Sequence, residues 1–152
     1  MIQTIPVEDS DEHFNLRATG GLVVKNLTQP ATLLWNPKST GFLINDGEGS
    51  GQVSRLRYFH WNGHRWHESR ALDRIATALY KRRYDCRGGK NSYTNVSGWN
   101  WTSSGYLRAV VQEGVHSEGC IQPYEDRNVL FEIIGDPLTG RVISARDVRT
   151  LP

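Results

Sequence analysis

The 152-residue sequence predicts a mainly β domain, either a barrel or a small sandwich of about six strands, with one amphipathic helix over residues 69–83. Short apolar segments rich in β-branched residues alternate with glycine, proline and asparagine turns, which is typical of antiparallel strands. A single stretch has helical periodicity. The hydrophobic fraction of 38% is sufficient for a core, and the length suits one domain. No apolar run has the length of a membrane span.

The first residues differ from the rest of the chain. Four acidic residues, Glu8, Asp9, Asp11 and Glu12, occur within residues 1–18, and this segment shows little hydrophobic periodicity. We therefore expect an N-terminal tail or an edge extension here. Residues 19–152 are expected to form a single β-rich domain, with a helix-containing insertion at about residues 67–104.

The first strands of that domain are short. Turn residues separate the apolar segments Leu22–Val24, Ala31–Trp35 and Gly41–Ile44. The next segment, Val53–Trp66, is both aromatic and basic, and it contains Asn62-Gly63, the strongest short hairpin signal in the chain. A meander that ends in a hairpin is expected.

Residues 69–83 give the helix. Its apolar positions are Leu72, Ile75, Ala76, Leu79 and Tyr80. Ser69 is the expected N-cap, and the basic residues Lys81, Arg82 and Arg83 suit the C-terminal turn because the helix dipole favours cations there. Gly88-Gly89 should end the helix, and residues 90–104 are expected to be a long loop or two irregular strands.

The end of the chain predicts another hairpin. Strands are expected at Val129–Ile134 and Arg141–Ile143, joined by the turn Asp136–Gly140. In the first of these strands, Val129, Phe131 and Ile133 share one face, whereas Leu130, Glu132 and Ile134 share the other.

The charge is distributed unevenly. The net charge is only +2, but residues 55–90 contain ten basic and three acidic side chains. Such a segment suits contact with a polyanion, although a solvated helix face with its loops would look the same.

Three segments resemble the cold-shock or Y-box family. They are Thr32-Leu33-Leu34-Trp35-Asn36-Pro37-Lys38, Gly41-Phe42-Leu43-Ile44 and Arg57-Tyr58-Phe59-His60, and the closing hairpin of residues 129–148 is similar too. The second segment has one phenylalanine where the family has two. The resemblance implies an OB-like barrel that binds single-stranded nucleic acid, RNA more than DNA, without catalysis or a cofactor.

The same resemblance implies which residues bind. The base-stacking positions would be Trp35, Phe42, Tyr58 and His60. The remaining contacts are expected from Trp61 and from the cations Lys38, Arg57, Arg82 and Arg83. Aromatic residues on strands also serve as core, so the burial of these rings is the decisive observation.

An enzymatic alternative depends on Cys120. Ser117-Glu118-Gly119-Cys120-Ile121 resembles the Ser-x-Gly-Cys-Ile core of L,D-transpeptidases, which implies Cys120 as a nucleophile with a histidine base. His116 is the nearest histidine, but the His-Gly pair that the family has upstream is missing. Gln122 also stands where the family has an arginine.

Two further alternatives remain open. His60, His64 and His67 have a spacing that could bind a metal. The five tryptophans, including Trp99 and Trp101, also suit a module that binds a protein or a glycan. We expect a cytoplasmic protein with no membrane partner, although a mature secreted chain would have the same features.

Overall fold

The computed structural model describes residues 2–7, 10–28, 31–46, 55–84, 94–113 and 130–149. The elements are β1 (Ile2–Val7), β2 (Ser10–Ala18), β3 (Leu22–Thr28), β4 (Thr32–Trp35), β5 (Gly41–Asp46), β6 (Arg55–Trp61), β7 (Trp66–Ser69), α1 (Ala71–Arg83), β8 (Thr94–Trp101), β9 (Leu107–Glu113), β10 (Leu130–Gly135) and β11 (Val142–Val148).

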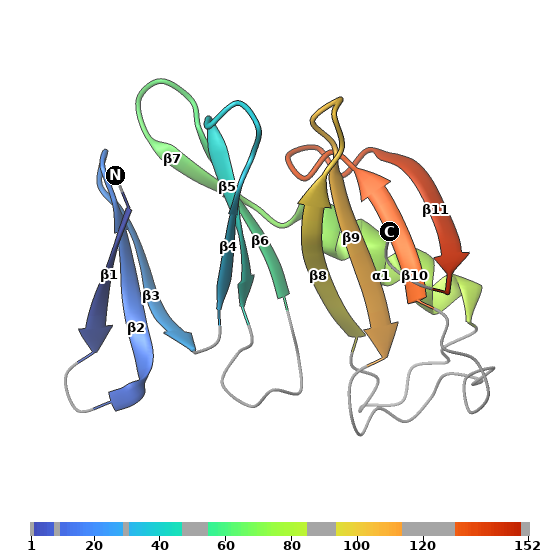
Figure 1. The fold of residues 1–152 in the computed structure, drawn as a ribbon, viewed down its shortest axis with the longest axis horizontal. Helices are drawn as coiled ribbons and strands as arrows, with labels where there is room; N and C mark the ends of the chain where they lie inside the picture. The colour runs from blue at the N-terminus through green and yellow to red at the C-terminus, as the bar shows by residue number, and fades with distance from the viewer. Residues whose placement is uncertain are drawn as a thin grey trace.

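The strands form three sheets in chain order. β1-β2-β3 make the N-terminal sheet, β4-β5-β6-β7 the middle sheet and β8-β9-β10-β11 the C-terminal sheet. Every pair of hydrogen-bonded neighbours is antiparallel and consecutive in sequence. Figure 1 shows the three sheets following one another across the molecule, with the middle sheet between the other two. Each sheet is therefore a meander built from local contacts.

The mainly β prediction with one helix is confirmed, but the expected strand count of about six is too low. The described residues contain eleven strands, and none of the three sheets closes into a barrel. Residues 2–7 and 10–18 form β1 and β2, with β1 at the edge of its sheet. Residues 94–101, expected as part of a long loop or of two irregular strands, form strand β8, whose pairing with β9 shifts register between Gly98 and Asn100. Val96 and Gly98 of this strand pack inward toward the middle sheet.

The middle sheet is buried on both faces. Along β5, Phe42 and Ile44 join one apolar core, whereas Leu43 belongs to the other. Alternate residues of a strand point to opposite faces, so a strand between two cores needs an unbroken apolar run. The run Gly41–Ile44 meets this requirement.

The first core lies between the N-terminal and middle sheets. Leu16, Val24 and Leu27 from the N-terminal sheet pack with Phe42, Ile44 and Phe59 from the middle sheet. Phe42 and Phe59 are cross-strand neighbours whose rings stack at 5.2 Å between centroids. This core holds β2 and β3 against the middle sheet.

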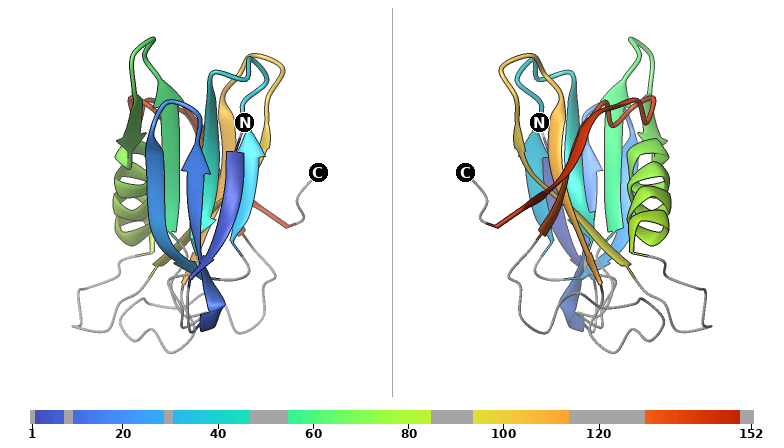
Figure 2. Two further views of the ribbon diagram at one scale, coloured as in Figure 1. Left: turned by 90° about the vertical axis from the view of Figure 1, so that its left-hand side faces the viewer. Right: turned by 90° about the vertical axis from the view of Figure 1, so that its right-hand side faces the viewer.

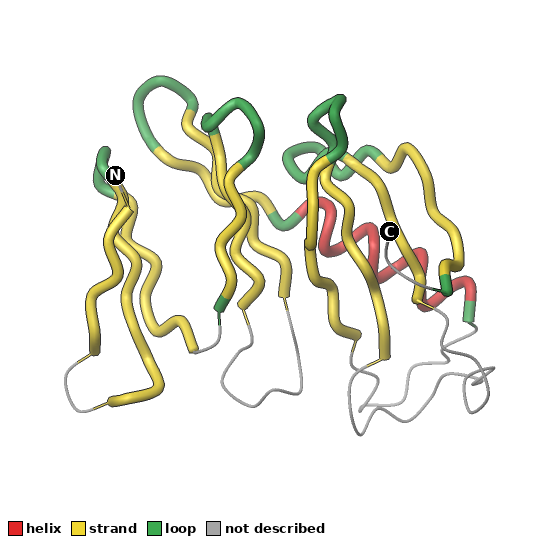
Figure 3. Tube along the Cα trace, in the orientation of Figure 1, coloured by secondary structure: helices red, strands yellow, loops and turns green. Residues whose placement is uncertain are grey.

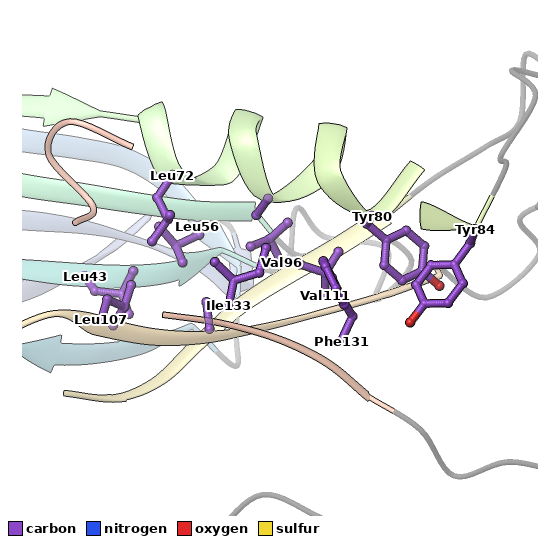
Figure 4. Packing of buried hydrophobic residues seen from close by; sticks show 12 residues of the cluster. Leu43, Leu56, Leu72, Tyr80, Tyr84, Val96, Leu107, Val111, Phe131 and Ile133 are labelled. Carbon is purple, nitrogen blue, oxygen red and sulfur yellow. The ribbon is translucent and has the colours of Figure 1, made fainter. Parts of the chain in front are cut away.

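The second core is shared by the middle sheet, α1 and the C-terminal sheet. The middle sheet contributes Leu43 and Leu56, α1 contributes Leu72, Ala76 and Tyr80, and Tyr84 directly follows the helix. The C-terminal sheet contributes Val96, Leu107, Ala109, Val111, Phe131 and Ile133. Figure 4 shows these side chains between the helix and the strands. In the side views of Figure 2, α1 runs along the flank of the molecule beside the sheets. The helix therefore lies next to the middle sheet and covers part of the inner face of the C-terminal sheet.

The helix starts two residues later than predicted. Its N-cap is Arg70, and Ser69 acts differently: its hydroxyl accepts a hydrogen bond from the Ala71 backbone N–H at 3.2 Å. The same hydroxyl lies within 3.0 Å of the Pro137 carbonyl oxygen. Lys81, Arg82 and Arg83 occupy the last turn as predicted. Ile75 is exposed rather than buried, because Leu72, Ala76 and Tyr80 form the buried stripe.

Two predicted turns are confirmed. Asn62-Gly63 joins β6 to β7, with Gly63 at a φ of 97°. The turn at residues 136–140 joins β10 to β11, and the Asp136 carboxylate accepts a hydrogen bond from the Leu138 N–H at 2.9 Å. Within the ranges that the structure describes, no helix is long and apolar enough to cross a membrane.

Candidate nucleic-acid interface

Five turns gather at one end of the molecule. They connect β2 to β3, β4 to β5, β6 to β7, β8 to β9 and β10 to β11, and Figure 3 shows them as loops at the upper end. Three tryptophans stand where strands of the middle sheet meet these turns. Trp35 ends β4, Trp61 ends β6 and Trp66 begins β7. We call these three residues the tryptophan rim.

The rim lies on the face of the middle sheet that carries the first core. Trp61 and Trp66 are direct partners across the hairpin, with ring centroids 5.6 Å apart. Trp66 in turn lies 6.5 Å from Trp35 and 5.1 Å from the buried ring of Phe42. Trp35 is 41% exposed, and the other two indoles are half-buried. The rim is thus a continuation of the core that reaches solvent.

The β2–β3 turn fixes two of the indoles. The Trp66 Nε1–H donates to the Thr19 carbonyl oxygen at 2.8 Å. Gly20, at a φ of 91°, lies against Trp61, and a Cβ there would be 2.6 Å from the indole Cζ3. Glycine is needed at this position both for the backbone conformation and for the close approach. The rim is consequently held in place before any ligand arrives.

Two cations lie in the turns beside the rim. Lys38 is exposed in the β4–β5 turn and Arg65 in the β6–β7 turn. The Asn62 side-chain oxygen accepts hydrogen bonds from the backbone N–H groups of His64 and Arg65, at 3.0 and 2.9 Å, which shapes the second turn. In the described ranges neither Lys38 nor Arg65 forms an ion pair with an acidic residue. Their positive charges remain available to an anionic ligand.

The structure does not bring the predicted stacking residues onto one surface. Phe42 has no exposed surface and Tyr58 is 6% exposed, so neither ring can stack on a base without rearrangement. Tyr58 and His60 also point away from Trp35 and Phe42, toward the C-terminal sheet, because they occupy the other register face of the middle sheet. Burial raises the pKa of Tyr58, and its hydroxyl accepts a hydrogen bond from the Asn36 amide at 3.2 Å.

Arg57 is engaged within the protein. Its guanidinium donates to Glu68 at 2.9 Å and to Asp46 at 3.1 Å, on the same sheet face as the rim. Burial alone would lower the pKa of Arg57, but the hydrogen bonds and charges of Glu68 and Asp46 outweigh it and raise the pKa. Both carboxylates already neutralise this cation. The expectation that Arg57 contacts a phosphate is therefore not supported by its surroundings.

The three histidines do not converge. His60 and His67 are cross-strand partners with stacked rings 5.4 Å apart, whereas His64 lies in the turn between them. The His67 Nε2 faces the Asn62 amide at 2.8 Å and the Arg65 Nε at 3.2 Å, and it accepts both hydrogen bonds when unprotonated. Burial and then the neighbouring His67 lower the pKa of His60. No group of three or more potential ligands that could hold a metal occurs in the described part of the chain.

The helix cations lie away from the rim. Arg82 and Arg83 are exposed in the last turn of α1, beside the C-terminal sheet. Arg83 donates to Asp147 on β11, and the Tyr84 hydroxyl donates to the same carboxylate. Arg83 therefore has an acidic partner on β11, and neither residue extends the surface around the tryptophans. Cys120 and His116, the candidates for nucleophilic chemistry, lie outside the described residues.

Of the predicted binding residues, Trp35, Lys38 and Trp61 come together at one end of the middle sheet. Sequence reasoning did not single out Trp66 or Arg65 as nucleic-acid contacts. The signal was available, since a two-strand hairpin centred on Asn62-Gly63 places the aromatic residues that flank its turn opposite one another. The comparison with known proteins adds no relative: no family model, no curated protein and no solved structure matches the chain.

Proposed function

We propose that the protein binds single-stranded nucleic acid at the tryptophan rim, RNA more than DNA, without catalysing a reaction. The observation that carries the proposal is the contact between three indoles that reach solvent, next to two cations that have no acidic partner in the described part of the chain. Stacking on an aromatic ring is worth about 1–3 kcal/mol per base and makes little demand on sequence. Lys38 and Arg65 would contact the phosphates.

The proposal retains the ligand class implied by the cold-shock resemblance but changes the residues. Trp35, Lys38 and Trp61 remain, and Trp66 and Arg65 replace the buried or paired side chains. An OB-like barrel is not required for it, since an exposed aromatic surface and unpaired cations can act on an open sheet. A glycan would also stack on the indoles, but it would not use the two positive charges.

Binding of fluorescein-labelled oligouridine and oligothymidine, measured by anisotropy at two salt concentrations, tests the proposal. Trp35→Ala should weaken binding by about 1–3 kcal/mol, because one base loses its stacking partner. Since Trp35 is 41% exposed, thermal melting should show that this variant stays folded. Equal wild-type affinities for the two oligonucleotides would contradict the preference for RNA.

The charge contribution has its own variant and control. Lys38→Gln combined with Arg65→Gln should reduce the slope of log affinity against log salt by about 1.4, from about 0.7 per phosphate contact on a single strand. Arg83→Gln removes a charge of the same sign at the far end of α1 and should leave the slope unchanged. Absence of binding at low salt would refute the proposal. Tight, salt-insensitive binding of an oligosaccharide instead would assign the rim to a glycan.

A further inference from the structure

The outer face of the C-terminal sheet carries a buried carboxylate between two arginines. On β10, Phe131 and Ile133 face the second core, so Glu132 between them points to the opposite face. Its side chain has no exposed surface. Arg146 is its direct register partner on β11, and Arg108 reaches it from β9. A carboxylate buried this completely requires compensating charges.

Each carboxylate oxygen is used by one arginine. Arg108 donates from Nε and Nη2 to Oε1, and Arg146 donates from Nε and Nη2 to Oε2 at 3.1 and 3.0 Å. The two guanidinium groups are thereby fixed in orientation with Glu132 between them. We call Glu132, Arg108 and Arg146 the Glu132 cluster, and its net charge is +1.

The cluster has more donors than acceptors. A guanidinium carries five N–H groups, and the hydrogen bonds to Glu132 occupy only the Nε and Nη2 side of each arginine. The Arg108 guanidinium carbon lies 4.6 Å above the Trp99 ring, which further restricts the arginine. A ligand here has to supply negative charge and several acceptor oxygens.

We infer that this face of the C-terminal sheet is an anion site for a phosphate group, bound by Arg146 and Arg108. Arginine recognises phosphate through paired N–H groups, and arginines whose orientation is already fixed lose little entropy on binding. Arg146 is 58% exposed and would contact the phosphate first, whereas Arg108 is 19% exposed and would donate to it from the more buried side of the cluster. Glu132 is a positioning residue: it orients both guanidiniums and does not contact the ligand. The inference is independent of the tryptophan rim.

Isothermal titration of the full chain with inorganic pyrophosphate at constant ionic strength tests this site. Saturable binding is expected, and Arg146→Gln should weaken it about tenfold or more, because charge-assisted hydrogen bonds are lost. Arg141→Gln is the matched control, since Arg141 is exposed before β11 and lies outside the cluster. It should bind pyrophosphate as the wild type does. Equal losses in both variants, or no saturable binding by the wild type, would overturn the site.

Glu132→Gln separates positioning from simple charge attraction. The substitution raises the net charge of the cluster from +1 to +2, so general attraction predicts tighter binding. Loss of the fixed arginine geometry predicts weaker binding, which is the result we expect. Tighter binding would refute the positioning role, and the exposed Arg146 keeps the site testable if Glu132→Gln does not fold. Succinate binding as tightly as pyrophosphate would overturn the assignment to phosphate.

Competition identifies the source of the phosphate. Displacement of pyrophosphate by oligouridine would assign the site to the backbone of a nucleic acid. If oligouridine leaves pyrophosphate bound, the site serves a separate phosphate-bearing ligand. Both results retain the phosphate site, and the tryptophan-rim variants decide the proposed function separately.

Discussion

Two charge clusters in this protein have opposite arrangements. In one, Arg57 lies between Asp46 and Glu68, and Arg70 pairs with the outer side of Glu68 at 2.7 Å. We call these four residues the Arg57 cluster, and their charges sum to zero. In the Glu132 cluster a carboxylate lies between two arginines, which leaves a charge of +1. The first cluster lies toward the N-terminal sheet, and the second on the outer face of the C-terminal sheet.

The difference shows what makes a charged group available to a ligand. A buried charge needs groups of opposite charge around it, and both Arg57 and Glu132 have them. In the Arg57 cluster the outer residues cancel the charge completely, so a ligand meets no excess of either sign. In the Glu132 cluster the outer residues are arginines, and one positive charge remains uncancelled. The sequence-based expectation selected Arg57 as a nucleic-acid contact because it is an arginine in a basic segment, but Asp46 and Glu68 already cancel its charge.

The largest expected effect is that of Glu132→Ala. Removing the central carboxylate leaves Arg108, 19% exposed, without its partner, and breaking a buried ion pair costs about 3–5 kcal/mol. Urea denaturation followed by circular dichroism measures the free energy of unfolding. A decrease in the free energy of unfolding below about 1 kcal/mol would show that water hydrates the two arginines without penalty when Glu132 is absent. It would also contradict the view that Glu132 is a buried charge on which the cluster depends.

Arg57→Ala should have the next largest effect, a loss of about 1.5–3 kcal/mol, which is the range for hydrogen bonds to charged groups. Asp46 and Glu68 would lose their shared cation, although Glu68 keeps Arg70. The guanidinium also lies 5.4 Å from the centre of the Phe59 ring, so some packing is lost. Thermal and urea unfolding test the change. A matched loss of nucleic-acid affinity in a folded Arg57→Ala protein would contradict our exclusion of this residue.

The cost of Arg57→Ala should depend on pH. Burial alone would raise the pKa of Glu68, but hydrogen bonds from Arg57 and Arg70 outweigh it and lower the pKa below the ordinary value of 4.5. A lowered carboxyl pKa stabilises the fold fully above that ordinary value, and the contribution is lost as the pH falls through the folded-state pKa. The difference in stability between wild type and variant should therefore narrow below about pH 4.5. Urea titrations at pH 7 and pH 3.5 measure it, and a constant difference would argue that packing alone is lost.

The smallest effects are expected at the exposed arginines of the two clusters. Arg70→Ala should cost about 0.2–1 kcal/mol, because both partners of its ion pair are exposed to solvent. Arg146→Ala should cost about 0.5–1.5 kcal/mol, because it removes hydrogen bonds from the fully buried Glu132, which keeps Arg108. Arg70 is 47% exposed and Arg146 58%. The two variants should differ most in function: pyrophosphate affinity falls only in Arg146→Ala. Equal pyrophosphate affinities in the two variants would remove the functional distinction between the clusters.

Local sequence signals predicted local structure well. Asn62-Gly63 specified the β6–β7 hairpin because glycine adopts the positive φ that the turn requires. The periodicity of Leu72, Ala76 and Tyr80 predicted the buried stripe of α1. Residues 1–18 were expected only as a tail or an edge extension, since their acidic residues interrupt any clear alternation, so the central position of β2 in its sheet was not predicted. Leu16 and Ala18 in β2 are nevertheless buried, because the middle sheet provides an apolar surface for them.

The candidate site was predicted only in part. Trp35, Lys38 and Trp61 were selected, and the structure gathers them at one end of the middle sheet. The sequence did not reveal that Phe42 and Tyr58 are buried, because a strand covered on both sides has the same composition as one with an exposed aromatic face. Nor did it show the Glu132 cluster, whose members come from three strands and meet only through sheet register.

The sequence by itself determined the elements that depend on near neighbours: the antiparallel hairpins, the helix and its basic last turn. These follow from turn chemistry and side-chain periodicity, which act over a few residues. The tertiary structure alone decided which side chains are covered and which charges are cancelled. It placed the middle sheet between two cores, which buried Phe42 and Tyr58. It also paired Arg57 with two acids, whereas Lys38 and Arg65 have no acidic partner among the residues that the structure describes. Burial and charge pairing depend on segments far apart in the chain, and short sequence patterns carry no information about those contacts.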